Sequence, residues 1–248
     1  MTRYKINLEY DGTDLIGWQE NAQGPSVQSL TQDAIFQFCG EKTEVFSAGR
    51  TDAGVHAINM TAHFDLEREQ NAETVMRAMN FYLTDKPVSV LNCEKVSDDF
   101  HSRFSCIARY YKYIVLNRSA PVVLKKNRVW WVPQKLDIDA MRNAAKKLIG
   151  NHDFTSFRAA QCQSKSPIKT LDSVNIIQNG DEIIFEFSAR SFLHHQVRNM
   201  VGTLVEIGMG KPLDIDEIFK AKNRSAAGIN APACGLYFVN ADYSTDDD

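Results

Sequence analysis

The sequence lacks any apolar run close to the roughly 20 residues that a helix needs to cross a bilayer. Residues 1–5 lead directly into a strand pattern without the apolar stretch of a secretory signal, so we expect no signal peptide. The five cysteines are few and odd in number, and none forms a C-x-x-C pair, which argues against a disulfide framework and a thiolate zinc site. We therefore expect reduced thiols and a cytoplasmic location.

Acidic residues are absent from three stretches, although the chain has 31 Asp and Glu against 28 Lys and Arg and a formal net charge of −3. No Asp or Glu occurs in residues 101–136, 154–171 or 187–205, and the acids gather elsewhere, notably at Asp246–Asp248. In the first stretch, aromatic residues are interleaved with basic ones. Because cations bind phosphates and aromatic rings stack on bases, this pattern favours nucleic-acid binding, although a strand with a solvated basic face would look similar.

A hydrophobic content of 44% and a charged content of 24% are ordinary for a globular protein, which excludes disorder and fibrous structure. Period-two and period-3.6 patterns follow one another in two sets, with a hairpin at Asn179-Gly180 rather than strict βαβ alternation, so we expect an α+β fold with a largely antiparallel sheet. Strands are predicted at 4–10, 43–48, 58–66, 87–96, 106–116, 172–178, 182–189 and 235–241. Helices are predicted after Ser26 and Asn71, from Asp137 to Leu148, over about 192–207, and from Asp214 or Asp216.

The loop Gly49–His56 places a cation, a hydroxyl and a carboxylate between two glycines, directly after a predicted strand. Glycine permits tight turns and the close approach of a ligand, and loops at strand ends often carry chemistry. Asp52 is therefore a candidate reactive group. The alternative is an ordinary turn in which Asp52 accepts hydrogen bonds from nearby backbone N–H groups.

This octapeptide resembles the active-site motif of the tRNA pseudouridine synthase A family, whose members isomerise uridine to pseudouridine. Five further segments resemble the family's other motifs in order and spacing, and together the six cover nearly the whole chain. These segments are Tyr10–Gln19, Asp99–Tyr113, Asp153–Phe157, Phe192–Gly202 and Gly235–Tyr237.

The resemblance implies the two-part pseudouridine synthase fold, with a largely antiparallel central sheet flanked by helices and an active cleft between the halves. We expect an N-terminal half, residues 1–105, carrying the Asp52 loop, and a C-terminal half, residues 106–248, carrying the Tyr111 strand and the Arg198 helix. The implied partners are the anticodon stem-loop of tRNA and a second copy of the chain in a homodimer. No cofactor, metal, membrane or DNA is implied.

By resemblance, Asp52 is the nucleophile that isomerises uridines at positions 38, 39 and 40 of tRNA. Detaching uracil, turning it and rejoining it through carbon neither gains nor loses atoms, so no redox cofactor or group donor is required. The carboxylate could attack the base, attack the sugar, or remove a sugar proton. The resemblance pairs it with Arg198, since a buried carboxylate needs a counter-charge to stay ionised, and assigns Tyr111 to stacking or proton transfer.

Further substrate contacts are expected from cations and imidazoles in the same motifs and in the acid-free stretches: Arg50, Arg109, Arg158, His194 and His195, together with the ring of Tyr111. Arg50 is implied to hold the flipped nucleotide or fill its place. His194 and Arg198 are four residues apart, so we expect them on one face of a helix. The histidines lack a carboxylate or thiolate at metal-ligand spacing, so we expect no metal site.

The chain departs from the family pattern at Leu15, at Asn59-Met60 and at Lys169, which stands where arginine is common. These departures concern substrate contacts rather than the proposed chemistry. Two other functions fit parts of the sequence. A non-catalytic tRNA-binding protein of the same fold would use the basic and aromatic block alone. A glycosidase would use Asp52 with a second carboxylate, for which the motifs offer no candidate.

Overall fold

The computed structural model describes residues 1–244, so the acidic tail Asp246–Asp248 lies outside the described residues. Within residues 1–244, five α-helices and eleven strands form a mixed α+β structure in which most strand pairs are antiparallel, as expected from the sequence. The chain divides into two compact units. The first unit is Met1–Arg109 with the chain from Tyr237 onward, and the second unit is Tyr110–Leu236. None of the helices in the described part is long and apolar enough to cross a membrane.

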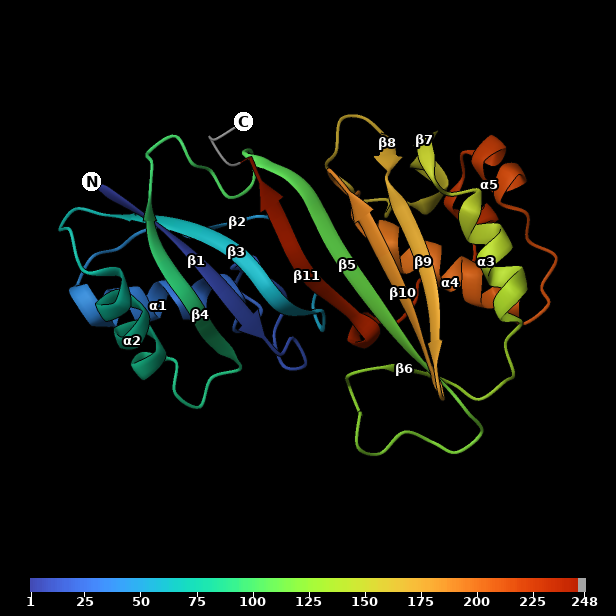
Figure 1. Cartoon of the computed structure of the whole chain (residues 1–248), viewed down its shortest axis with the longest axis horizontal. Coiled ribbons are helices and arrows are strands. Elements are labelled where there is room, and N and C mark those ends of the chain that lie inside the picture. The colour runs from blue at the N-terminus through green and yellow to red at the C-terminus, as the bar shows by residue number, and fades with distance from the viewer. Residues whose placement is uncertain (245–248) are drawn as a thin grey trace. The chain divides into compact units, whose positions relative to one another are not determined.

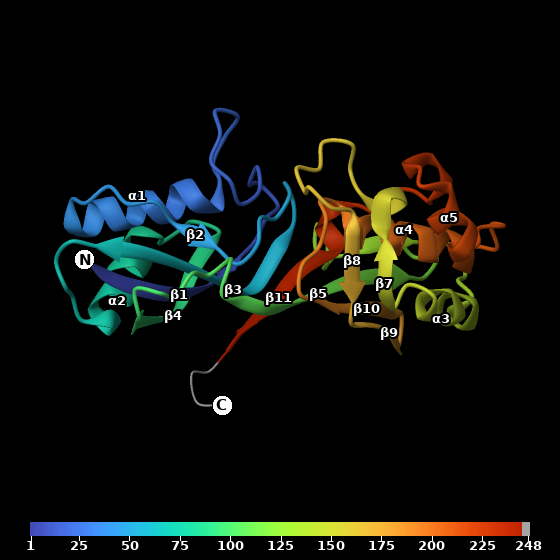
Figure 2. The same ribbon diagram turned by 90° about the horizontal axis from the view of Figure 1, so that it is seen from above.

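The first unit is a sheet with strand order β4-β1-β3-β11, and β2 pairs with β3 (Figure 1). Strand β11 runs parallel to β3, whereas β1, β2 and β4 form antiparallel pairs. Helix α2 packs against β4 and contacts α1 (Figure 2). The elements are β1 (Thr2–Tyr10), α1 (Val27–Cys39), β2 (Phe46–Ser47), β3 (His56–Leu66), α2 (Ala72–Tyr82), β4 (Val88–Val96) and β11 (Leu236–Tyr243).

Alternation and capping explain these elements. Tyr4, Ile6, Leu8 and Tyr10 are buried while their neighbours on β1 are more exposed, which confirms the predicted strand. Ser26 forms a capping box with Ser29 at the start of α1, and Asn71 accepts two backbone N–H groups at the start of α2.

The strand predicted over 43–48 is wrong in extent, because only Phe46–Ser47 pairs with β3. Two glutamines of α1 take the backbone groups of Val45 instead. The Oε1 of Gln32 accepts the Val45 N–H at 3.1 Å, and the Nε2 of Gln28 donates to the Val45 carbonyl at 3.1 Å. These side chains satisfy groups that a longer strand would have paired, so β2 stays short.

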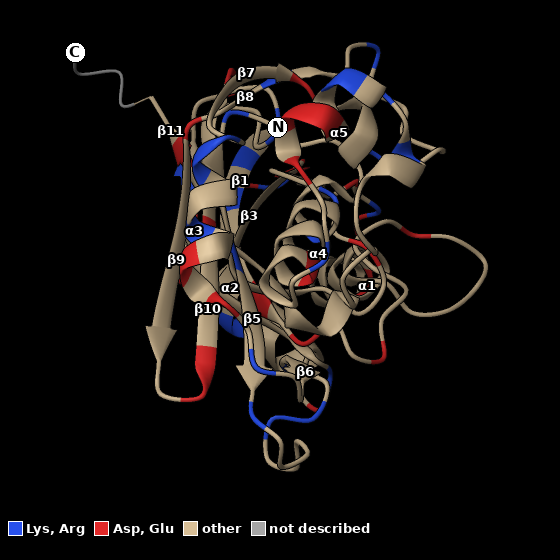
Figure 3. Cartoon of the chain, turned by 90° about the vertical axis from the view of Figure 1, so that its right-hand side faces the viewer, with Lys and Arg blue, Asp and Glu red and all other residues tan. Residues whose placement is uncertain are grey.

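The second unit contains strands β5, β10 and β9 in that order, with β6 parallel to β5 and a separate antiparallel pair β7-β8. Helix α3 packs against α4 and β9. Lys and Arg gather on the loop that joins β5 to β6 (Figure 3). The elements are β5 (Cys106–Asn117), β6 (Trp130–Val132), α3 (Ile138–Lys146), β7 (Gly150–Asp153), β8 (Ile168–Leu171), β9 (Ser173–Asn179), β10 (Glu182–Ala189), α4 (Gln196–Gly208) and α5 (Ile215–Ala221).

Three predicted boundaries in this unit are corrected. Helix α3 ends at Lys146 rather than Leu148, because the next residues form i→i−3 turns. The hairpin turn is Gly180-Asp181, one residue later than expected, since Asn179 pairs with Glu182. Helix α5 begins after Asp214, which resolves the alternative with Asp216.

Helix α4 begins at Gln196, four residues later than expected. His195 precedes it with φ 64°, a left-handed conformation that cannot continue a helix toward the N-terminus. The side chain of Gln196 accepts the Leu193 N–H at 2.8 Å and closes a turn at that point. The expectation that His194 and Arg198 share a helical face is therefore wrong, because His194 lies outside the helix.

Candidate functional site

The loop that carries Asp52 is held from one side by the segment between β1 and α1. Gly17 forms a bridge with Asp52, and the Trp18 N–H donates to the Thr51 carbonyl at 3.0 Å. A side chain at Gly17 would begin 2.5 Å from that carbonyl oxygen, and the residue has φ 105°, so this close approach requires glycine. Two motifs that the sequence separates by about thirty residues thus form one structure.

The backbone around Asp52 is fixed by a tight turn. Its carbonyl accepts the Val55 N–H at 3.1 Å, and Gly54 takes a left-handed φ of 79°. Thr51 and Val55 are buried on either side, and the Thr51 hydroxyl is 2.8 Å from the hydroxyl of Tyr10. The Asp52 side chain itself is half-buried. The backbone that carries this carboxylate is therefore held in place before any ligand arrives.

His56 links this loop to β11. The imidazole is 2% exposed, its Nδ1 accepts the Gly12 N–H at 3.0 Å, and its ring stacks on Tyr237 with centroids 4.8 Å apart. A Cβ at Gly12 would overlap the Val55 carbonyl, so this contact also depends on glycine. His56 therefore supports the far end of the Asp52 loop.

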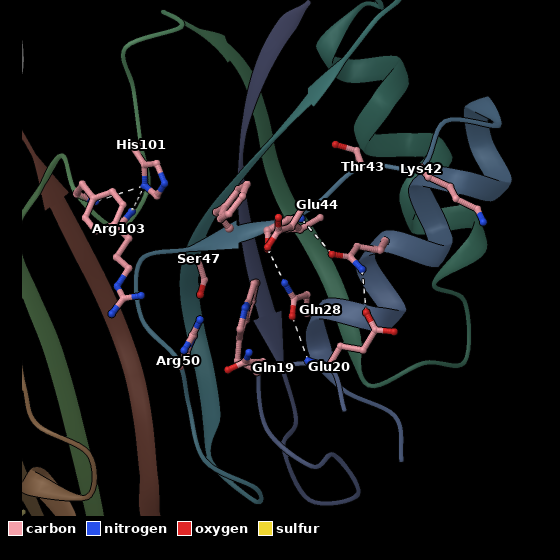
Figure 4. A pocket seen from close by; sticks show the side chains of 15 residues that line it. Gln19, Glu20, Gln28, Lys42, Thr43, Glu44, Ser47, Arg50, His101 and Arg103 are labelled. Carbon is pink, nitrogen blue, oxygen red and sulfur yellow. Dashed lines mark hydrogen bonds between the residues drawn. The ribbon is translucent and has the colours of Figure 1, made fainter. Parts of the chain in front are cut away.

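A cavity of about 640 Å³ opens beside the loop within the first unit, with Arg50 and Arg103 among its lining residues (Figure 4). Arg50 is exposed. Burial lowers the pKa of the Arg103 guanidinium, and the positive charges of Arg50 and Arg109 lower it further. Arg50, Arg103 and Arg109 thus concentrate positive charge on this side of the first unit.

Arg109 differs from the other two because it is 8% exposed. Its Nε donates to the Ala48 carbonyl at 2.8 Å, and its guanidinium also donates to the Arg103 carbonyl at 2.8 Å. This side chain supports the start of the Asp52 loop and the segment carrying Arg103. The structure therefore gives Arg109 a supporting contact in addition to any contact with substrate.

In the second unit, Tyr111 is half-buried on β5, and its ring meets Phe192 edge-on with centroids 5.1 Å apart. Arg198 is half-buried on α4, and its Nε donates to the Ala231 carbonyl at 2.8 Å. The adjacent carbonyl, of Pro232, accepts from the hydroxyl of Tyr113 at 2.7 Å. The segment 231–232 therefore ties the Tyr111 strand to the Arg198 helix.

Burial raises the pKa of Tyr113 well above its usual value, while the nearby Arg198 charge acts in the opposite direction. Tyr113 is 0% exposed, so its phenol serves as a hydrogen-bond donor in the core. Tyr111, two residues earlier, is the more accessible of the two rings.

The two adjacent histidines lie at the start of α4. Their ring centroids are 4.1 Å apart, with His194 exposed and His195 half-buried. The His194 carbonyl accepts the Ala159 N–H at 2.9 Å, which brings the histidines next to the segment carrying Arg158. Arg158 is half-buried and follows the 3-10 turn Phe154–Phe157. Asn230 reaches the Nδ1 of His195 at 3.3 Å.

Sequence reasoning missed two groups. Arg103 and Phe104 line the cavity beside the Asp52 loop, and an arginine followed by an aromatic residue in an acid-free stretch could have indicated them. Segment 230–232 holds His195, Arg198 and Tyr113, and only its backbone carbonyls and one amide do so. No sequence pattern identifies a backbone carbonyl as a ligand.

Comparison with known proteins places this arrangement in a class. Residues 144–244 match a family model described as tRNA pseudouridine synthase. The chain is 53% identical over 245 residues to the tRNA pseudouridine synthase A of Rhodospirillum centenum, covering 98% of this chain and 100% of that protein. It is 48% identical over 246 residues to that of Paramagnetospirillum magneticum, covering 98% and 96% of the two chains.

The class is thus an isomerase, and the protein is an enzyme. The chain belongs to the tRNA pseudouridine synthase A family. Among solved structures, it aligns with a chain of a Cbf5-Nop10-Gar1 complex at a TM-score of 0.38 and 12% identity, covering 95% of this chain and 48% of that one.

Proposed function

We propose that this enzyme isomerises uridines at positions 38, 39 and 40 of the tRNA anticodon stem-loop, with Asp52 as the nucleophile. The observation that carries the proposal is the half-buried Asp52 on a backbone fixed from both sides, in a loop whose Arg50 lines a cavity together with Arg103. Family membership supplies the reaction, and the acid-free basic and aromatic stretches suit an RNA substrate.

An ionised carboxylate serves each of the three routes considered for this isomerisation. It adds to the base, displaces the base from the sugar, or removes a sugar proton. It is regenerated respectively when the adduct is eliminated after loss of the C5 proton, when C5 of the base displaces it from the sugar, or when it returns the sugar proton. The overall change leaves the atoms of the uridine unchanged in number. We assign Arg198 the role of the cation that keeps Asp52 ionised, and Tyr111 the role of a ring that packs on the target base.

The remaining cations and imidazoles are proposed to bind the RNA. Arg50 is exposed two residues before Asp52, which suits contact with a flipped nucleotide. Arg158, His194 and His195 come together in the second unit and are assigned to contacts with the sugar–phosphate backbone of the RNA. Arg109 is assigned to substrate binding, to which it contributes by supporting the start of the Asp52 loop. We further propose that the enzyme acts in the cytoplasm as a homodimer, without cofactor or metal.

The test uses unmodified tRNA labelled with tritium at C5 of uridine, because pseudouridine formation releases that label to water. We expect release by the wild type, mapped to positions 38–40, and near-complete loss with Asp52→Asn. That substitution removes the charge while preserving the shape, so folding and tRNA binding should persist. Asp33→Asn, at an exposed position on α1, is the matched control and should release label normally.

Appreciable turnover by Asp52→Asn would remove Asp52 from the role of nucleophile. Tight tRNA binding without release by the wild type would favour the alternative of a non-catalytic tRNA-binding protein. Release mapped outside the anticodon stem-loop would leave the isomerase in place and overturn the proposed target positions.

A further inference from the structure

The side chain of Phe104 projects into solvent from a hydrogen-bonded turn at the rim of the cavity. Its side chain is 72% exposed, whereas the turn beneath it is closed by hydrogen bonds at both ends. The His101 N–H donates to the Ser105 Oγ at 3.0 Å, and the Ser105 N–H donates to the His101 carbonyl at 2.9 Å. The Nδ1 of His101 also accepts the Arg103 N–H at 3.1 Å. The ring is therefore exposed without being free to move with a loose loop.

The same turn is anchored to the sheet. Ser102 is 0% exposed, its Oγ donates to the Phe46 carbonyl at 2.8 Å, and its N–H donates to the Nδ1 of His63 at 3.2 Å. Phe46 lies on β2 and lines the cavity together with Phe104. These contacts fix the position of the exposed ring relative to the cavity and to the strand that leads into the Asp52 loop.

Positive charge accompanies this ring. The guanidinium of Arg103 lies 5.7 Å from the centre of the Phe104 ring. Among the described residues of the first unit, neither Arg50 nor Arg103 has a carboxylate within ion-pair distance. Two carboxylates also line the cavity, those of Glu20 and Glu44 (Figure 4). The Glu20 carboxylate accepts from Gln32 at 3.1 Å on the side next to α1. Two guanidinium groups and an exposed ring thus share one end of the cavity.

We propose that this end of the cavity binds an unpaired nucleotide that flanks the target uridine, its base stacked on Phe104 and its phosphate bound by Arg50 and Arg103. The inference rests on the proposed function, because it takes tRNA as the substrate. An aromatic platform beside cations is the arrangement that holds single-stranded RNA, and stacking accepts any base. The cavity volume of about 640 Å³ falls in the range of small-ligand sites and suits a nucleotide.

This end of the cavity lies next to the Asp52 loop, so the proposed contact would act where the target uridine leaves its stack. A uridine must leave its stack before it can react, and the neighbouring nucleotide then loses a stacking partner. Phe104 offers that neighbour a replacement surface, and the two arginines hold the backbone in the distorted path. Phe104 and Arg103 are therefore positioning residues, which act on the substrate's shape rather than on the reacting atoms.

The experiment is a mutant cycle between Phe104 and the bases of the anticodon arm. Full-length unmodified tRNAs are assembled with a single abasic nucleotide at each unpaired position in turn, and Kd is measured for wild type, Phe104→Ala and Phe104→Trp. We expect Phe104→Ala to weaken binding of intact tRNA by roughly 5- to 150-fold, the range that one stacked base provides, and Phe104→Trp to restore it. At one abasic position the alanine substitution should have no further effect.

Phe81→Ala is the matched control, since Phe81 is 71% exposed in the same unit and lies away from the cavity lining. It should bind every tRNA as the wild type does. Unchanged Kd for Phe104→Ala would overturn the proposal, and so would an equal loss for all abasic tRNAs, which would indicate a structural role. Failure of the wild type to release tritium would instead count against the proposed function, and the binding cycle would still report on the stacking contact.

Discussion

His63 on β3 shows how one buried imidazole affects the first unit. It is 2% exposed, and its Nδ1 lies 2.9 Å from the Ser102 hydroxyl and accepts the Ser102 N–H. Burial lowers its pKa to about 4, and the charges of His101 and Arg3 contribute in the same direction. The neutral ring thus holds the turn that carries Phe104 by accepting the Ser102 N–H.

This pKa predicts a loss of stability on acidification. Between pH 6.5 and about 4, the unfolded chain binds a proton at this position that the folded chain excludes, so stability falls as pH falls through that window. The loss attributable to His63 should reach roughly 3 kcal/mol at the lower end. Urea unfolding at a series of pH values measures it. His63→Gln should show a shallower dependence, and a slope equal to that of the wild type would contradict the assignment.

At the level of single residues, the sequence predicts where Asp52 lies but not what surrounds it. The glycines and the adjacent strands indicate a loop, and the structure has one between β2 and β3. Burial of Arg109 and exposure of Phe104 do not follow from the sequence, although they lie five residues apart. The guanidinium of Arg109 donates to the carbonyl of Ala48, a residue distant in sequence that it reaches only in the folded unit.

The two glycines of helix α4 meet different neighbours, and Gly202 packs closely on the segment after Gly228. A Cβ at Gly202 would overlap the Ile229 carbonyl, a backbone atom next to the segment that binds Arg198. A Cβ at Gly208 would instead meet the sulfur of Met141 at 2.8 Å, and a methionine side chain can move aside. The helix therefore contains one glycine that packing requires and one that it tolerates.

We predict that Gly202→Ala lowers stability by up to about 2 kcal/mol, because overpacking against backbone costs about 1–3 kcal/mol and outweighs the gain in helix propensity of about 1 kcal/mol. It should also reduce tritium release, since displacing residues 229–231 moves the carbonyl that orients Arg198. Gly208→Ala, in the same helix, should change both quantities much less. Thermal unfolding and the release assay provide the comparison. Equal effects of the two substitutions would show that the Ile229 contact is not the cause.

Capping residues and periodicity predict most elements, and the errors lie where side chains replace backbone partners. Ser26, Asn71 and Asp137 cap helices as expected, because an N-cap is a local interaction. The short β2 and the late start of α4 were missed, since each depends on glutamine side chains that bond to backbone groups. Strands β6, β7 and β8 are too short to produce a clear period.

For the whole molecule, the distribution of charge matters more than its total. The net charge of −3 coexists with acid-free stretches, and one of them includes the loop between β5 and β6. We predict that tRNA affinity falls steeply with salt. A plot of log affinity against log salt concentration should have a slope near −0.9 for each phosphate contact. Titrations from low to moderate salt measure the slope. An affinity that salt leaves unchanged would exclude these stretches as the binding surface.

The proposed homodimer is a second property of the whole molecule. Sedimentation equilibrium should give a mass near twice that of the 28.0 kDa chain. A mass near that of one chain at micromolar concentration would contradict the dimer. The measurement needs no tRNA, so its outcome is independent of the catalytic proposals.

Strand β11 also determines when the first unit can finish folding. It pairs with β3 at Tyr237 and Phe238, beside the His56 that supports the Asp52 loop, yet the ribosome synthesises it only after residues 110–236. At common synthesis rates that interval is on the order of ten seconds. The nascent chain therefore leaves the His56–Ala57 end of β3 without its β11 partner during that interval, while β2 already pairs further along the same edge. The loop that holds Asp52 is completed only after the second unit has left the ribosome.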